Sequence, residues 1–233
     1  MFSVIFEVLP KKEKFDEYLN LAKQLKPLLE KVDGFVDNER FESEQREGWI
    51  LSHSTWRDEK SVVRWRTTGE HHMIQEQGRD GVLNDYHLRV GDVTTDTGAP
   101  SEAPVHEQRF DETEVGVSTL MTLTEIVPEQ GIELGAPKQI MEGLGISAFT
   151  ASIADNDVFA SIYNKGKYAV LISWKDAAAG TQWTPVKADG LKTLRHRTIR
   201  IVRDYGMFDR REAPQFYPDA IGHATKHAEP KKN

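Results

Sequence analysis

The chain has 233 residues, of which 38% are hydrophobic and 29% charged, a balance typical of a globular protein with a sizeable core. The formal net charge is -7 and the Lys and Arg residues are scattered, which argues against a nucleic-acid-binding surface. No apolar run approaches the roughly 18 residues of a membrane span, and the absence of cysteine excludes disulfides and a cysteine nucleophile. The N-terminal charges follow the apolar run, the reverse of a secretory signal, so we expect a cytoplasmic protein.

The first part of the chain alternates between strand and helix patterns. Four segments carry a strand pattern: residues 2–10, 35–43, 49–56 and 86–95. From residue 15 to residue 32 apolar side chains recur every three or four positions, the period of an amphipathic helix, and Gly34 is placed to end it. A second helix is predicted at residues 58–65, with acidic residues in its first turn. The order β-α-β-β-α-β is that of a split βαβ, or ferredoxin-like, unit.

Part of this pattern occurs a second time. Four anchors recur at an offset of 118: Glu7 as Glu125, Pro10 as Pro128, Trp56 as Trp174, and Trp65 as Trp183. After the second Trp the offset falls to 108, because residues 88–96 match residues 196–204. The first copy therefore has ten additional residues at this point, within the segment TTGEHHMIQEQGR (67–79), and its pair of histidines belongs to that copy alone.

The second copy is predicted to be a degenerate version of the first. Its strands are expected at residues 115–127, 146–154, 158–164, 168–174 and 197–205. Its first helix should be shorter, because Pro and Gly residues interrupt residues 128–137. Residues 97–114, which contain two prolines and no hydrophobic period, are typical of a linker. The chain thus divides into a unit at 1–96, this linker, a second unit at 115–208 and a polar tail at 209–233.

In the first unit an acid follows Trp56 by two positions, and a second Trp follows it by nine, on a short helix. With "WRDEKSVVRWR", "EHHMIQEQGR" and "DYHLRV", this text resembles the antibiotic biosynthesis monooxygenase family, closely over residues 2–96 and more weakly over 115–208. The resemblance implies a dimeric α/β barrel. A lone four-stranded sheet would leave one apolar face uncovered. We therefore expect an α+β fold, with two tandem ferredoxin-like units packed sheet to sheet as an intramolecular dimeric α/β barrel.

The family resemblance also implies a kind of chemistry. Known monooxygenases of the family oxidise aromatic polyketide-like substrates with dioxygen and without metal or flavin, so a small-molecule substrate and no cofactor are expected. A haem-degrading branch has an Asn on the first strand, a Trp matching Trp65 and a His ten residues later. Here that position is Gln75 and the first strand has no Asn, which disfavours haem degradation but leaves His71 or His72 open as a shifted ligand.

Three residues of the first unit are candidates for catalysis: His71, Trp65 and Asn38. An imidazole with a pKa near 6.5 at His71 could remove a proton to form an enolate or phenolate, which could then reduce dioxygen. Trp65 would line the cleft, and Asn38 would polarise a carbonyl or orient a peroxide. Each has a structural alternative: a surface histidine, a core tryptophan repeated as Trp183, and an asparagine at a turn or strand edge.

Four further residues are candidates for the polar wall of the cleft that binds substrate: His72, Tyr86, Arg89 and Arg79. Arg89 would neutralise an enolate, although its repetition as Arg197 in the degenerate copy points to a structural role. No metal site is expected, because no two histidines of the first copy share the helical spacing of four that would make their side chains converge.

The leading hypothesis is a cofactor-independent monooxygenase that acts on a small aromatic or enolisable substrate. The first alternative is a non-catalytic protein that holds a small apolar ligand, and the second is a haem-binding or haem-degrading protein. No nucleic-acid or membrane partner is expected, and a homodimer is left open.

Overall fold

The computed structural model describes residues 1–69, 78–101 and 111–214. The strands are β1 (Phe2–Pro10), β2 (Phe35–Ser43), β3 (Ile50–Trp56), β4 (Leu83–Asp96), β5 (Leu120–Pro128), β6 (Ile153–Ser161), β7 (Tyr168–Trp174) and β8 (Leu191–Gly206). The α-helices are α1 (Phe15–Leu29), α2 (Glu59–Arg66), α4 (Pro137–Gly143) and α5 (Ala177–Gln182). The remaining described elements are two 3-10 helices, η1 (Lys12–Lys14) and η3 (Ile146–Ser152), and one π-helical turn, η2 (Gly78–Val82).

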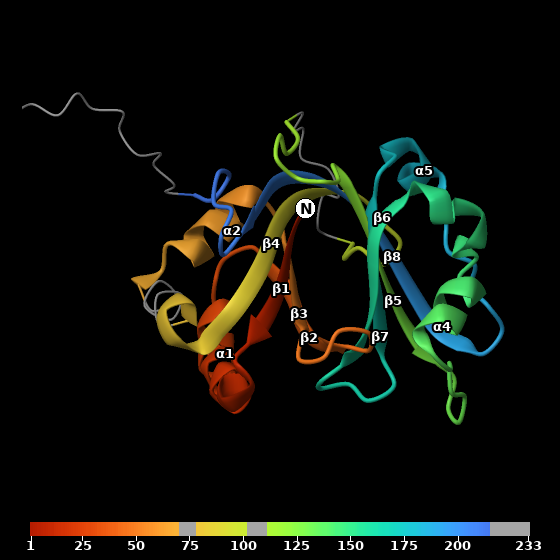
Figure 1. The fold of residues 1–233 in the computed structure, drawn as a ribbon, viewed down its shortest axis with the longest axis horizontal. Helices are drawn as coiled ribbons and strands as arrows, with labels where there is room; N and C mark the ends of the chain where they lie inside the picture. The colour runs from red at the N-terminus through yellow and green to blue at the C-terminus, as the bar shows by residue number, and fades with distance from the viewer. Residues whose placement is uncertain (70–77, 102–110, 215–233) are drawn as a thin grey trace, which may run out of the picture.

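The strands form one closed barrel in the order β1-β3-β2-β6-β7-β5-β8-β4, and neighbouring strands run antiparallel. Helices α1 and α2 lie outside the barrel on one side, and α4 and α5 lie outside it on the opposite side (Figure 1). In the described ranges no helix is long and apolar enough to cross a membrane.

The strand registers confirm both offsets of the repeat. Ile5 of β1 pairs with Arg89 of β4, and Leu123 of β5 pairs with Arg197 of β8. The first members of these pairs are 118 positions apart and the second members 108, as the sequence comparison requires. The two halves of the chain therefore repeat each other at the level of single residue pairs.

The halves join through two ladders that obey the same symmetry. In the ladder between β4 and β8, Arg89 pairs with Asp204 and Arg197 pairs with Asp96. Exchanging the two halves converts one of these pairs into the other. The ladder between β2 and β6 completes the closure. Equivalent positions in the two halves can therefore be compared directly.

Local sequence explains the element boundaries of the first half. Pro27 lies in the last turn of α1, and Gly34 follows the helix with a φ of 88°, a left-handed conformation that favours glycine. A Cβ on Gly34 would lie 2.0 Å from the Oγ of Ser61, so a side chain there would push α2 away. Asp58 caps α2 by accepting a hydrogen bond from the Ser61 amide at 2.8 Å.

The prediction of a strand at residues 146–154 was wrong. Residues Ile146–Ser152 form a 3-10 helix, and β6 begins only at Ile153. The apolar residues that suggested a strand pack instead against the sheet, where Ile146 is buried and Phe149 contacts Trp174 edge-on. Strands β4 and β8 also begin earlier than predicted, because the first residues of β4 pair with the end of β1 and the first residues of β8 pair with the end of β5.

The core has an inner part and outer parts. Inside the barrel, apolar side chains from all eight strands form one cluster, which includes Phe41, Leu123 and Phe159. This cluster covers the sheet faces that either half alone would expose. Further clusters lie between the barrel and the outer helices. The helix-covered faces of the two halves are filled differently, and that difference produces the candidate site.

Candidate active site

A cavity of about 450 Å³ lies between the outer face of the first-half strands and helices α1 and α2. Alternate residues of the strands form its floor, because successive side chains of a strand point to opposite faces. Leu21, Leu25 and Leu29 of α1 form one wall, and Trp65 of α2 forms another. Most of the lining is therefore apolar, which is typical of a small-molecule site.

The charged residues of this cavity are mainly basic. Four arginines line it, Arg40, Arg66, Arg203 and Arg210, against one carboxylate, that of Glu59. The Nε of Arg203 lies 4.0 Å from the Glu59 carboxylate, so one positive charge has a partner within the cavity. In a chain with a net charge of -7, this local excess of positive charge favours an anionic group inside an apolar ligand.

Arg40 is the most deeply placed of these arginines. It lies on β2 and is only 9% exposed. Its Nη1 donates to the Oδ1 of Asn38 at 3.1 Å, while its Nε has no hydrogen-bond partner. No carboxylate of the described residues forms an ion pair with it. A buried guanidinium without a counter-ion is costly in the free protein, and an anionic ligand would relieve that cost.

Asn38 is held in place on the cavity floor. Its Nδ2 donates to the backbone oxygen of His53 at 2.8 Å, which fixes the amide so that Oδ1 faces Arg40. Asn38 pairs with Ser54, and Asn156 pairs with Ile172. The two asparagines are therefore equivalent at the offset of 118.

Trp65 and Trp183 occupy equivalent positions and have different surroundings. Trp183 is 2% exposed and packs against Trp174 at a ring distance of 5.7 Å and His196 at 5.2 Å. Trp65 is only half-buried and forms part of the cavity wall. In the second half, Trp183 fills the region that corresponds to the cavity beside Trp65 in the first half.

The second half has an apolar core where the first has the cavity. The residue equivalent to Arg40 is Val158, which is fully buried, and those equivalent to Ser52 and Ser54 are Val170 and Ile172. These side chains pack with Ile140 and Met141 of α4 and with Trp183. The first half therefore keeps polar groups on a face that the second half uses for packing.

Three tyrosines contribute hydroxyl groups to the cavity, Tyr18, Tyr86 and Tyr205. Burial raises the pKa of Tyr18, and burial together with the nearby Tyr86 raises the pKa of Tyr205 to about 12. Both phenols stay protonated at neutral pH and can donate hydrogen bonds. The hydroxyl of Tyr86 accepts a hydrogen bond from Nη1 of Arg210.

The predicted site residues divide into three groups. Asn38, Trp65 and Tyr86 lie together around the cavity. His71 and His72 lie outside the described residues, although Trp65 and Gly78 on either side of that gap both line the cavity. Of Arg79 the structure describes only the backbone, in the turn η2.

Arg89 faces away from this cavity and does not join the other candidates. The alternation of β4 turns its side chain into the barrel, where Nη1 donates to Glu7 at 2.7 Å. In the second half Arg197 donates to Glu125 at 2.6 Å. The two ion pairs are equivalent, and this repetition is the signal that had pointed to a structural role for Arg89.

Sequence reasoning missed the deepest and the most distant cavity residues. Arg40 had one available signal, since it occupies an outward strand position at which the other copy has Val158. Arg210 and Pro214 come from the segment assigned to the polar tail, and they close one side of the cavity. Ala213 anchors this segment in the apolar cluster beside α1. No local pattern relates residues 209–214 to a cavity formed by the first hundred residues.

Within the described ranges, no group of three or more His, Asp or Glu side chains could hold a metal ion.

The closed antiparallel barrel with outer helices defines the class as an α+β barrel. The model of the family described as "Antibiotic biosynthesis monooxygenase" matches residues 1–77. The jasmonate monooxygenase ABM of Pyricularia oryzae is 42% identical over 229 residues, which cover 94% of this chain and all of that protein. The chain belongs to the antibiotic biosynthesis monooxygenase family.

A similar fold occurs in a solved structure. An aldoxime dehydratase aligns with 86% of this chain and 80% of its own, at 9% identity and a TM-score of 0.52. An antibiotic biosynthesis monooxygenase aligns over its whole length with 41% of this chain, at 17% identity and a TM-score of 0.37.

Proposed function

We propose that the protein is a cofactor-independent monooxygenase that oxidises a small apolar substrate bearing an anionic or enolisable group. The observation that carries the proposal is the first-half cavity, which combines apolar walls with four arginines and one glutamate. Family membership supports oxygen chemistry. The name of the relative from Pyricularia oryzae supports an apolar carboxylate of the jasmonate kind as the substrate to test first.

The proposed reaction begins with loss of a proton from an activated C–H group. His71 remains the predicted base, and Arg40 would stabilise the resulting anion. The electron-rich carbanion would then transfer an electron to dioxygen, and recombination would give a peroxide on the substrate carbon. When an activated methylene becomes a carbonyl, one dioxygen yields the carbonyl oxygen and one water, so no external reductant is required. A simple hydroxylation would instead require two electrons from a donor.

We also propose that the two halves are ferredoxin-like units, at 1–96 and 115–208, that form an intramolecular dimeric α/β barrel. The equivalent ladders between the halves support this interpretation. In it, the second unit covers the inner sheet face of the first and has lost its own cavity to packing around Trp183. Pairing of two whole chains remains a prediction.

Oxygen consumption with a matched substrate panel tests the proposal. The panel contains jasmonate, other apolar carboxylates, the methyl ester of each acid, and enolisable phenols, with and without NADPH. We expect oxygen uptake with acids and a much higher KM for their esters, because the esters cannot use the arginines. Tight binding without oxygen uptake would identify a non-catalytic binding protein. Added haem that gives a Soret band and is consumed would support the haem alternative instead.

A further inference from the structure

The two ends of the barrel carry equivalent acidic groups with different partners. At one end Asp96 and Asp37 lie beside the Glu125–Arg197 ion pair. Their equivalents at the other end are Asp204, 108 positions on, and Asp155, 118 positions on. The offsets are those that the strand registers establish, so the two ends can be compared residue by residue.

At the first of these ends an arginine bridges the two carboxylates. Arg195 donates from Nε and Nη2 to Asp96 at 2.9 and 2.7 Å, and from Nη1 to Asp37 at 3.0 Å. Two nitrogens of the guanidinium thus bind the Asp96 carboxylate side by side, and the third nitrogen binds Asp37. Such paired hydrogen bonds are the reason why arginine binds carboxylates strongly. Its side chain is mostly buried and fills this end of the barrel.

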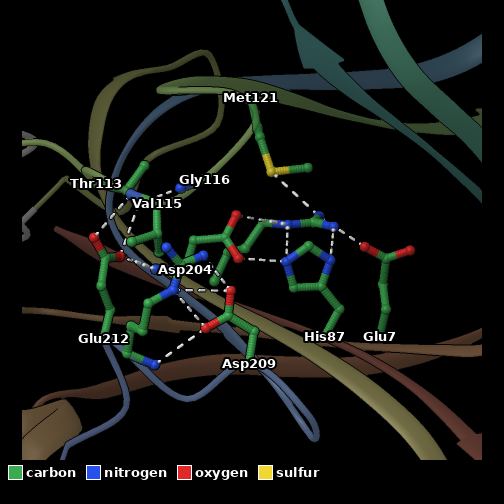
Figure 2. Close-up of polar contacts among 11 residues, drawn as sticks. Glu7, His87, Thr113, Val115, Gly116, Met121, Asp204, Asp209 and Glu212 are labelled. Carbon is green, nitrogen blue, oxygen red and sulfur yellow. Dashed lines mark hydrogen bonds and ion pairs between the residues drawn. The ribbon is translucent and has the colours of Figure 1, made fainter. Parts of the chain in front are cut away.

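At the other end the residue equivalent to Arg195 is His87, which is too short to reach both acids. Its Nε2 contacts the Oδ1 of Asp204, and its Nδ1 lies 2.6 Å from Nη2 of Arg89. Figure 2 shows the imidazole of His87 between Asp204 and Glu7. Because the arginine only donates, Nδ1 accepts from Nη2, and Nε of Arg89 also donates to Nε2 at 3.3 Å. In the described part of the chain Asp155 has no ion-pair partner, and its Oδ1 accepts only the Asn156 amide.

A cavity of about 380 Å³ lies at this end, bordered by His87, Asp204 and Asp155. Its lining includes five carboxylates and two guanidinium groups, an excess of three negative charges when His87 is neutral. Both arginines are already engaged. Arg46 pairs with Glu7 and Asp157, and Arg89 pairs with Glu7 and, at 3.8 Å, with Asp204. Two exposed apolar residues, Val117 (87%) and Phe208 (80%), also belong to the lining.

We propose that this cavity, which shares only Tyr86 and Tyr205 of its lining with the first, is a second ligand site that takes a small organic cation with a guanidinium or amidinium head and an apolar tail. The head would lie between Asp204 and Asp155. At the opposite end of the barrel, the guanidinium of Arg195 holds the equivalent place. Two donors of the planar head would face Asp204 and a third would face Asp155, as in the internal arginine pair. The apolar tail would lie against Phe208 and Val117.

Benzamidinium is a suitable probe because it joins a planar amidinium to an apolar ring, and benzamide is its neutral counterpart of similar shape. Calorimetric titration of the full chain should show binding of benzamidinium and none of benzamide. Asp155→Asn should weaken binding by roughly tenfold or more, because it removes a charged hydrogen-bond acceptor. Asp189→Asn, which removes an exposed carboxylate from the loop before β8, is the matched control and should bind as the wild type does.

His87→Arg gives the sharpest test, because it supplies within the chain a guanidinium at the position equivalent to Arg195. This variant should lose benzamidinium binding and should melt at a higher temperature. If it does not fold, Asp155→Asn decides the question, together with a ligand-induced change in the ring nitrogen shifts of His87. Equal binding of benzamide, absence of measurable benzamidinium binding, or binding unchanged by both variants would overturn the proposal. None of these readouts depends on monooxygenase activity, so this site and the proposed function fail or succeed separately.

Discussion

Replacing Arg40 by methionine keeps most of the length of the side chain and removes its charge. Arg40 is 9% exposed, and its Nε has no hydrogen-bond partner among the described residues. Hydrogen bonds to charged groups contribute about 1.5–3 kcal/mol, so loss of the contact with an anionic substrate should raise KM by about 10- to 150-fold. The methyl ester of the same substrate should show a much smaller change, because it offers no carboxylate to Arg40.

The same substitution should leave the protein as stable as the wild type or more stable. Exchanging a buried ion for an apolar side chain is often neutral or stabilising by about 1–4 kcal/mol. Part of this gain is offset because the 3.1 Å hydrogen bond to Asn38 is lost. We expect a net gain of about 1 kcal/mol, which corresponds to an increase in Tm of about 2–4 °C for a domain of this size.

The assay combines thermal denaturation with steady-state oxygen uptake. Arg64→Met is the matched control, because Arg64 lies on the exposed side of α2, pairs with Asp33 and does not line the cavity. It should leave KM unchanged. If Arg40→Met instead lowered Tm markedly and left KM for the acid unchanged, Arg40 would be a structural residue and the account of the cavity would be refuted.

Three further predictions follow from packing, titration and hydrogen bonding. Trp183→Ala should lower the free energy of unfolding by about 3–5 kcal/mol in a denaturant titration. Trp65→Ala should lower it less and should reduce the rate of oxygen uptake. Equal losses of stability in the two variants would contradict this prediction. Burial, with the Arg197 charge, lowers the pKa of His53 to about 4, and burial lowers that of His196 to about 4. Because the unfolded chain takes up these protons near pH 6.5 and the folded chain only near 4, stability should fall as the pH decreases through that interval, and His53→Gln should flatten the profile. Glu212 accepts hydrogen bonds from the Thr113 hydroxyl and from the Val115 and Asp204 amides (Figure 2), and from the Glu114 amide. Glu212→Ala should therefore cost about 1–3 kcal/mol, while Glu212→Gln should cost less.

Most of the architecture could be predicted from the sequence. Strands β1, β2 and β7 occur at the predicted residues, whereas the first helix ends at Leu29, earlier than predicted, and Gly34 lies in the turn before β2. Alternation, helical period and turn chemistry act over a few residues, so they are visible in the chain itself. The repeat was equally visible, because both copies need Trp56 and Trp174 to fill the space between sheet and helix.

The cavity depended on relations that no local pattern expresses. Arg40 lines the cavity, whereas Val158 at the equivalent position packs against α4. The packing of the outer helices therefore decides which of the two side chains borders a cavity. The contribution of Arg210 and Pro214 requires the end of β8 to return beside the first helix. Arg89 and His87 line only the second cavity, whereas Tyr86 lines both, because adjacent residues of one strand face opposite sides of the barrel wall.

The sequence by itself determined the repeated β-α-β-β-α-β order, the two offsets and the family resemblance, because these follow from short-range periodicity and from comparison of the chain with itself. Only the tertiary structure decided that Arg40 lies in the cavity of the first half without an ion-pair partner among the described residues, that Arg210 and Pro214 line this cavity, and that Arg195 at one end of the barrel corresponds to His87 at the other. These features depend on side chains more than a hundred positions apart, whose proximity is set by the closure of the barrel.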